Sequence, residues 1–576
     1  MYGICPECNA SFWGWCPPCN SKHFQNDFDK WTSGNNAIDK LIQDAQLNTF
    51  DVLDVIEWIP YDRFKDIKEI AKGGFGIIYK ATWIDGPIWR WNVKNLQWNR
   101  DGQDDVALKK FNNNFANLNE GFINEIEIHL KTRSKFASIR IYGITQDPET
   151  NEYIMALEYM KDGNLRDHLK NNFNNIDWKL KLGYLKELTS KFKNIHKLDI
   201  IHHDFHPGNI LSYDFKYSLS FDFLSSNLTG YSLYISDFGL SKLIGQNIKN
   251  PEKRQIFGVL PYIAPEVLSG EEYTKAADVY SFGIVAYEII TGFAPYHDIP
   301  HDIDLARQIC NGLRPKIPFH IPKLITRLIM RCWDAQVTHR PTFEELNDKF
   351  YYYFRDYSRN KCKNNNEITI QIKHAEKFAK NNKNKEKVGF GNLIRNILTN
   401  STIPTPINYK THPEAIYTSR LLDYSSLPKP KNDKNFEKEI DELTKSISTL
   451  SIVTIPILWE LTLGQRHYTV GEVKKKALCI RTYISCMDTQ ARTLLIQNGF
   501  DLSSSPSQAT FDYPSFTNKF VINDLVNFIF EYSSKINPQQ IVGSDQNSND
   551  KNESRILFRG KRGDNFIFLQ THEKLV

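Results

Sequence analysis

The sequence predicts an α+β fold with two lobes, a β-rich lobe followed by a mainly helical one. Three observations lead to this prediction. The chain has 576 residues, which is more than one hydrophobic core usually organises, so several domains are expected. The composition, 41% hydrophobic and 24% charged, is that of a globular protein. From residue 64 to about residue 354 the apolar pattern is first strand-like and then helical.

Four cysteines near the start of the chain form two matched CxxC pairs. Each pair can place two thiolates on one ion, and four thiolates satisfy the tetrahedral coordination of Zn²⁺. The alternative is a group of reduced cysteines that binds no metal. We interpret residues 1–62 as a candidate zinc-binding segment followed by a helical lead-in. The candidate ligands are Cys5, Cys8, Cys16 and Cys19.

Charge and hydropathy argue against nucleic acid and membrane partners. The formal charge is only +5, and the basic residues are interleaved with acidic ones over most of the chain. The N-terminus lacks the basic and apolar regions of a signal peptide. The most apolar later stretch, residues 450–464, is short and contains Pro456 and Glu460. We expect a soluble protein in the cytoplasm.

The central lobes are expected to span residues 64–354. The stretch 355–435 is rich in Lys and Asn, which is the composition of a solvated linker. Residues 436–576 regain apolar content and are predicted to form an α-rich extension, for which the sequence indicates no chemistry.

Several motifs in the central region carry chemistry. "KEIAKGGFGIIYKA" (68–81) is a glycine-rich turn between two strand-like runs, where backbone N–H groups can approach phosphate. "VALKK" then places Lys109 at the end of a strand, and "FINEIEIHL" offers Glu125 on a helix that could hold this lysine by an ion pair. "HHDFHPGN", "SDFG" and "APE" follow in the order that phosphoryl transfer from Mg-ATP requires.

This ordered set resembles a protein kinase domain over residues 64–354, about half of the chain. The wording "GVLPYIAPEV", "DVYSFG" and "RPTF" resembles the tyrosine-kinase-like (TKL) group, particularly members expanded in fungi. The paired CxxC segment and "THPEAIYTSRLL" near residue 411 also resemble flanks of such fungal kinases. The resemblance implies a bilobal protein-kinase-like fold, with ATP and Mg²⁺ between the lobes and protein substrates.

Carried onto this sequence, the resemblance implies a role for each motif residue. Asp204 orients the substrate hydroxyl or accepts its proton, Lys109 holds the α and β phosphates, and Glu125 positions Lys109. Asn209 and Asp237 hold magnesium. The nucleotide-binding residues are Ile70, Ala71, Lys72, Gly73, Gly74, Phe75, Gly76, Ile78, Ala107, Lys109, Glu158, Met160 and Leu211, with Leu157 as gatekeeper.

The sequence departs from the family pattern at several positions. Ala71 replaces the first glycine of the phosphate loop. His203 replaces an arginine that pairs with a phosphate on the activation loop in many kinases. His206, counted here as a catalytic residue, replaces the lysine that serine/threonine kinases direct at the transferring phosphate. The run 242–263 holds no Ser or Thr, and of its residues only Tyr262 could be phosphorylated. We therefore expect activity that does not require activation-loop phosphorylation.

Two functions stay open at this point. The first is an active protein kinase, with Ser/Thr favoured over Tyr by group resemblance, because the five central residues named above are all present. The second is a pseudokinase or scaffold that binds nucleotide or partners without efficient transfer. It is motivated by Ala71, His203, His206 and the additional domains. The altered positions, however, support catalysis rather than perform it, which favours the first function.

Overall fold

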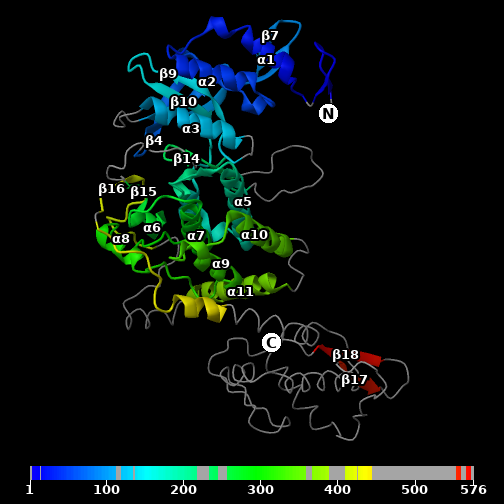
Figure 1. Cartoon of the computed structure of the whole chain (residues 1–576), viewed down its shortest axis with the longest axis vertical. Coiled ribbons are helices and arrows are strands. Elements are labelled where there is room, and N and C mark those ends of the chain that lie inside the picture. The colour runs from blue at the N-terminus through cyan, green and yellow to red at the C-terminus, as the bar shows by residue number, and fades with distance from the viewer. Residues whose placement is uncertain are drawn as a thin grey trace. The chain divides into compact units, whose positions relative to one another are not determined.

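The computed structural model describes residues 3–443, apart from 13, 75, 112–117, 134–136, 217–232, 244–255, 359–365, 388–408 and 425, together with residues 553–559 and 566–572. The chain divides into two compact units, residues 1–445 and 446–576 (Figure 1). In the second unit the described residues form one antiparallel hairpin of β17 (Glu553–Arg559) and β18 (Phe566–His572). The remainder of the expected α-rich extension lies outside the described residues, except for helical residues 436–443. No helix in the described part of the chain is long and apolar enough to span a membrane.

The N-terminal segment packs onto the β-rich lobe. Helix α2 begins after Asn35, whose side chain accepts hydrogen bonds from the backbone N–H groups of the first helical turn. Its buried residues Ile38 and Ile42 join the same apolar cluster as Phe122 and Ile126. The lead-in therefore shares a core with that lobe. The elements are β1 (Gly3–Ile4), β2 (Ser11–Phe12), α1 (Pro17–Gln25) and α2 (Asn36–Leu47).

A six-stranded sheet and one long helix make up the β-rich lobe. The sheet is antiparallel except for the short edge strand β3, which pairs in parallel with β9. The hairpin of β6 and β7 precedes Lys109, and its Trp98 packs with Trp15 and Phe24 of the N-terminal segment. In spatial order the sheet strands are β3 (Glu57–Trp58), β9 (Ile141–Gln146), β10 (Tyr153–Glu158), β8 (Asp104–Phe111), β5 (Gly76–Trp83) and β4 (Phe64–Lys72). The other elements are β6 (Ile88–Asn92), β7 (Gln97–Arg100) and α3 (Leu118–Arg133).

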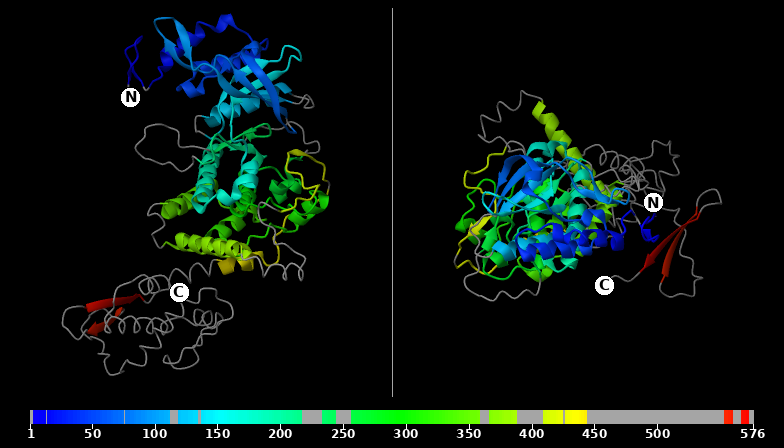
Figure 2. Two further views of the ribbon diagram at one scale, coloured as in Figure 1. Left: turned by 180° about the vertical axis from the view of Figure 1, so that it is seen from behind. Right: turned by 90° about the horizontal axis from the view of Figure 1, so that it is seen from above.

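The second lobe is mainly helical (Figure 2). Its helix α7 is buried over nearly its whole length. An apolar stripe of α5 faces this core: Leu185, Leu188, Phe192 and Ile195 are all fully buried. The helices are α4 (Leu165–Asn172), α5 (Trp178–Lys197), α6 (Pro265–Leu268), α7 (Lys275–Thr291), α8 (Ile303–Cys310), α9 (Lys323–Cys332) and α10 (Phe343–Ser358). Two short strand pairs, β11 (Ile200–Ile201) with β14 (Lys242–Leu243) and β12 (Ile210–Ser212) with β13 (Leu233–Ile235), lie in the same lobe.

The expectation of a solvated linker over residues 355–435 is wrong for the part that the structure describes. Helix α11 (Glu367–Lys387) turns Ile368, Ile372 and Ala375 into the core of the helical lobe. Further along, Leu422 is buried in the same core. Apolar residues at helical spacing were hidden among many Lys and Asn residues, so the mean composition concealed a packing face.

Candidate active site

Three side chains that lie far apart in the sequence meet between the lobes. Lys109 stands near the end of β8, Glu125 lies on α3, and Asp237 follows β13. Lys109 Nζ lies 2.5 Å from Glu125 Oε1 and 2.8 Å from Asp237 Oδ1. Burial opposes the charge of Lys109, but Asp237 and Glu125 outweigh it and raise its pKa. Burial likewise opposes ionisation of Asp237, yet the charge of Lys109 keeps the pKa of Asp237 below its usual value. Lys109 and Asp237 are therefore both charged at neutral pH.

Apolar and aromatic packing holds α3 in this position. Phe238, directly after Asp237, places its ring 5.1 Å from the ring of His129 on α3 and 5.0 Å from the ring of His202. Phe238, His129 and His202 are all fully buried. This continuous column couples the helix that carries Glu125 to the loop that carries Asp204.

Residues 202–209, which include Asp204 and Asn209, form the candidate catalytic loop, and a buried carboxylate on α7 holds it. Asp278 accepts hydrogen bonds from the backbone N–H groups of His202 (2.9 Å) and His203 (3.2 Å). Asn209 Nδ2 donates to the backbone oxygen of Asp204 at 2.9 Å. These bonds set the direction of the Asp204 side chain, which is 4% exposed.

Residues at the turn between β4 and β5 have the geometry of a phosphate-binding loop. The N–H of Gly73 donates to the backbone oxygen of Gly76 at 2.9 Å. A Cβ at Gly76 would lie 2.2 Å from the backbone oxygen of Lys110, so only glycine fits there. Ala71 pairs with Ile78 directly after a register shift in the ladder between Glu69 and Ala71. Lys72 ends β4 next to the turn, and Phe75 lies outside the described residues.

Several residues expected around the adenine belong to one apolar cluster. Ala107 and Leu211 are half-buried and pack on the cluster that contains the buried Leu157 and Met160. Glu158, at the end of β10, donates its backbone N–H to the oxygen of Arg140 at 2.9 Å. Two further members of the set are more open: Ile70 is 47% exposed and Ile78 is half-buried.

The chemistry of the site fits magnesium and ATP. Asn209 and Asp237 offer amide and carboxylate oxygens, which are the ligands that Mg²⁺ prefers. Lys109 supplies a fixed positive charge beside them. The site therefore combines a fixed lysine charge, oxygen ligands for a metal and a glycine turn that can bind phosphate. This combination fits a nucleoside triphosphate.

His203 is unsuited to bind a phosphate, because it is held neutral. Its ring stacks on Tyr273 with centroids 4.3 Å apart, and burial lowers the pKa of His203 to about 4. The backbone of His203 has φ 70°. This observation supports our expectation of activity without activation-loop phosphorylation.

The same burial makes stability depend on pH. Below its ordinary pKa of about 6.5 the histidine takes up a proton in the unfolded chain but not in the folded one. Stability is therefore lost as the pH falls from about 6.5 towards 4. Replacing His203 by Asn, which tolerates positive φ, is expected to remove about 2 kcal/mol of the loss between pH 7 and pH 5. Urea unfolding at both pH values measures this, and His339→Asn, at a side chain that is 51% exposed, is the control. An unchanged pH slope in His203→Asn would disprove this account.

Tyr262 does not serve as an activation-loop acceptor in this conformation. Its hydroxyl donates to Glu288 Oε2 at 2.5 Å and accepts from Arg166 Nη2 at 3.0 Å. The side chain is only 3% exposed. Tyr262 is therefore a structural residue of the helical lobe.

Sequence reasoning missed one residue at the site, Ser419. Its hydroxyl donates to Asp204 Oδ2 at 2.5 Å and lies 3.2 Å from His206 Nε2. Ser419 lies in the stretch "THPEAIYTSRLL", for which the sequence alone indicated no role at the site.

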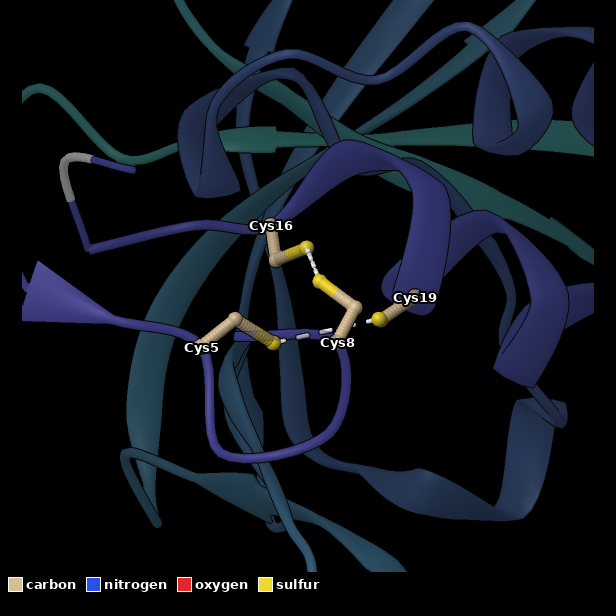
Figure 3. Close-up of side chains that lie close together, drawn as sticks. All are labelled: Cys5, Cys8, Cys16 and Cys19. Atoms are coloured by element: carbon tan, nitrogen blue, oxygen red, sulfur yellow. Dashed lines mark hydrogen bonds between the residues drawn. The ribbon is translucent and has the colours of Figure 1, made fainter. Parts of the chain in front are cut away.

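The four N-terminal cysteines form a second cluster, and Figure 3 shows their Sγ atoms turned towards one another. The Cys5–Cys19 and Cys8–Cys16 Sγ distances are 3.8 Å and 3.6 Å. Four thiolates around one zinc, at Zn–S bonds of about 2.3 Å, would be roughly 3.8 Å apart. The cluster thus fits a tetrahedral metal ion.

The comparisons with known proteins agree with the site. Residues 64–350 match the family model described as protein tyrosine and serine/threonine kinase, so the chain carries a protein kinase domain with a β-sheet lobe and a helical lobe. Similar proteins include "Probable serine/threonine-protein kinase roco5" of Dictyostelium discoideum, 30% identical over 50% of this chain and 10% of that protein.

The names of two other relatives indicate different acceptor residues for the phosphoryl group. "Dual specificity protein kinase zakA" of Dictyostelium discoideum is 28% identical over 45% of this chain and 36% of its own length. "Tyrosine-protein kinase SPK-1" of Girardia tigrina is 26% identical over 49% of this chain and 52% of its own length. The shared region is thus between a tenth and about half of the length of each of these relatives.

Proposed function

We propose that this protein is an ATP-dependent protein kinase that transfers the γ-phosphoryl group of Mg-ATP to protein hydroxyls, with Ser/Thr favoured over Tyr. The observation that carries the proposal is the assembled set of Lys109, Glu125 and Asp237 beside Asp204 and Asn209. Serine/threonine kinases among the matching relatives support the hydroxyl preference. We also propose that the kinase domain belongs to the TKL group. Only the sequence motifs support this assignment.

The chain's own residues would act mainly by position and charge. Bound Mg-ATP supplies the phosphoryl group and the metal charge. Lys109, fixed by Glu125, offsets negative charge on the phosphates without reorganising during transfer. Asp204 aligns the acceptor hydroxyl and receives its proton. Asn209 holds the Asp204 loop while its amide oxygen stays available to the metal.

Replacement of Lys109 by Met tests this proposal. Because the cation is lost while the volume is nearly kept, transfer from Mg-ATP to casein is expected to fall by about 10²–10³-fold. The matched control is Lys110→Met on the same strand, whose half-buried ammonium pairs with Asp147 and Glu152. Equal rates in Lys109→Met and wild type would refute the proposed function. A silent wild type that Mg-ATP still stabilises against heat would favour the scaffold alternative.

We also propose that the cysteine cluster binds one structural Zn²⁺. Support comes from the Sγ distances and from its packing: Trp15, next to Cys16, stacks on Trp98 of the β6–β7 hairpin with centroids 5.8 Å apart. The ion would tie the first turns of the chain to the β-rich lobe. Use of ATP and of thiolate ligands also suits an intracellular location.

Metal analysis of the full-length protein, purified without oxygen, tests the zinc proposal. We expect one zinc per chain in wild type and none in the double variant Cys8→Ser/Cys19→Ser. Chelation is expected to lower the melting temperature of wild type only. The control Cys362→Ser lies outside the cluster in sequence and should keep its zinc. Zinc-free wild type would refute the proposal.

A further inference from the structure

A segment C-terminal to the kinase domain, residues 409–424, runs along the helical lobe to the active site. Its backbone follows the loop that precedes α8. The N–H of His412 donates to the oxygen of His297 at 2.7 Å, and the N–H of His301 donates to the oxygen of Glu414 at 3.0 Å. The side chain of His301 also lies with Nδ1 2.9 Å from the oxygen of Ile416.

Side chains of the segment strengthen this attachment. The Tyr417 hydroxyl donates to the oxygen of Pro295 at 2.8 Å, and the guanidinium of Arg166 lies 4.6 Å from the centre of the Tyr417 ring. Arg420 Nη2 donates to the oxygen of His301 at 2.5 Å. Leu422 is 4% exposed and belongs to the lobe's core. The segment is therefore held against the helical lobe by hydrogen bonds and by apolar packing.

The segment also adds a strand to the part of the kinase domain that precedes "APE". Strand β16 (Arg420–Leu422) pairs antiparallel with β15 (Ile256–Gly258), and the two lie side by side in Figure 1. Gly258 pairs with Arg420, the residue directly after Ser419. Strand addition of this kind is a common way to bind an extended peptide. It fixes the register of the segment and so selects which residue reaches the catalytic loop.

The residue that this register presents is Ser419. The N–H of Gly208 donates to His206 Nδ1 at 3.1 Å, so a neutral His206 carries its proton on Nε2. That N–H points at Ser419 Oγ, 3.2 Å away, and Ser419 Oγ in turn donates to Asp204 Oδ2 at 2.5 Å. The hydroxyl proton is therefore directed at the proposed proton acceptor.

The phosphate loop reaches the same residue from the other lobe. A Cβ built on Gly74 would lie 2.5 Å from the backbone oxygen of Ser419, so the tip of the loop touches the segment. Ser419 thus lies between the loop expected to cover the ATP phosphates and the carboxylate expected to take the proton. The neighbouring hydroxyl, Thr418, is exposed.

We propose that Ser419 is an autophosphorylation site, presented in cis as the acceptor of this kinase; the inference rests on the proposed function. In the step, Ser419 Oγ forms a bond to the γ-phosphorus of ATP and the bond from that phosphorus to the β–γ bridging oxygen breaks. ADP leaves, and the hydroxyl proton passes to Asp204. The product carries a charge of about −1.5 to −2 next to Asp204, and this repulsion favours release of the segment from the site.

Mass-spectrometric mapping of full-length protein incubated with Mg-ATP tests the inference. We expect phosphate on Ser419, at a fractional rate that does not change when the protein is diluted tenfold. Ser419→Ala loses this phosphate, Ser419→Thr carries phosphothreonine at position 419, and the control Thr418→Ala is still modified on Ser419. Transfer to casein by wild type is measured in the same reaction.

The casein measurement distinguishes failure of the Ser419 inference from failure of the proposed kinase function. Phosphorylated casein with unmodified Ser419 would overturn the inference and leave the kinase function standing. Wild type that modifies Ser419 of the inactive Lys109→Met protein as fast as its own would overturn presentation in cis. No transfer to either acceptor would overturn both the proposed function and the inference.

Discussion

Asp204→Asn is expected to lower phosphoryl transfer by about 10²–10⁴-fold, the usual contribution of a positioned proton acceptor. The amide keeps the size of the side chain but accepts the hydroxyl proton far less well. The bond from Asn209 Nδ2 goes to the backbone oxygen of residue 204, so the loop should keep its shape. The affinity for Mg-ATP is expected to change little. Initial rates of labelled phosphate transfer, with nucleotide binding measured separately, give both numbers.

The control for this variant is Asp348→Asn, at an exposed position on α10. It makes the same chemical change away from the site and should leave the rate unaltered. If Asp204→Asn retained more than a tenth of the wild-type rate with normal nucleotide binding, Asp204 would not be the proton acceptor, and the alignment of the catalytic loop would be wrong.

Arg340→Ala is expected to destabilise the helical lobe by about 3–5 kcal/mol, because it leaves a buried carboxylate without its partner. Arg340 Nη1 and Nη2 each lie 2.7 Å from a carboxylate oxygen of Glu266. The Arg340 side chain is 0% exposed and that of Glu266 is 3% exposed. The free energy of unfolding in urea measures the loss.

A surface ion pair gives the contrast. Arg331 lies 3.9 Å from Glu345, and these side chains are 36% and 58% exposed. Arg331→Ala should therefore cost no more than about 1 kcal/mol. Similar losses in the two variants would show that the Glu266–Arg340 pair does not anchor the lobe as its burial implies.

Much of the interlobe site could be predicted because its residues belong to ordered motifs. A strand followed by an amphipathic helix suggested the ion pair of Lys109 with Glu125, and the resemblance to ordered kinase motifs implied the role of Asp237; the structure brings all three together. The strand-first, helix-later pattern likewise gave the order of the lobes. Local periodicity and motif order carry this kind of information well.

Contacts made by the C-terminal segment could not be predicted in this way. Ser419 lies 215 residues from Asp204, and neither periodicity nor local spacing links two such positions. The Lys/Asn-rich composition also hid the packing of Ile368 and Ile372 in α11. The neutral state of His203 was equally hidden, because burial is a property of the folded chain.

The most direct measurement is labelled phosphate transfer from Mg-ATP to casein by purified full-length wild type, followed by phosphoamino-acid analysis. The account predicts transfer proportional to enzyme concentration, recovered mainly as phosphoserine and phosphothreonine, and lost in Lys109→Met and Asp204→Asn. Wild type that transfers no phosphate, although Mg-ATP raises its melting temperature, would contradict the account and show a nucleotide-binding scaffold.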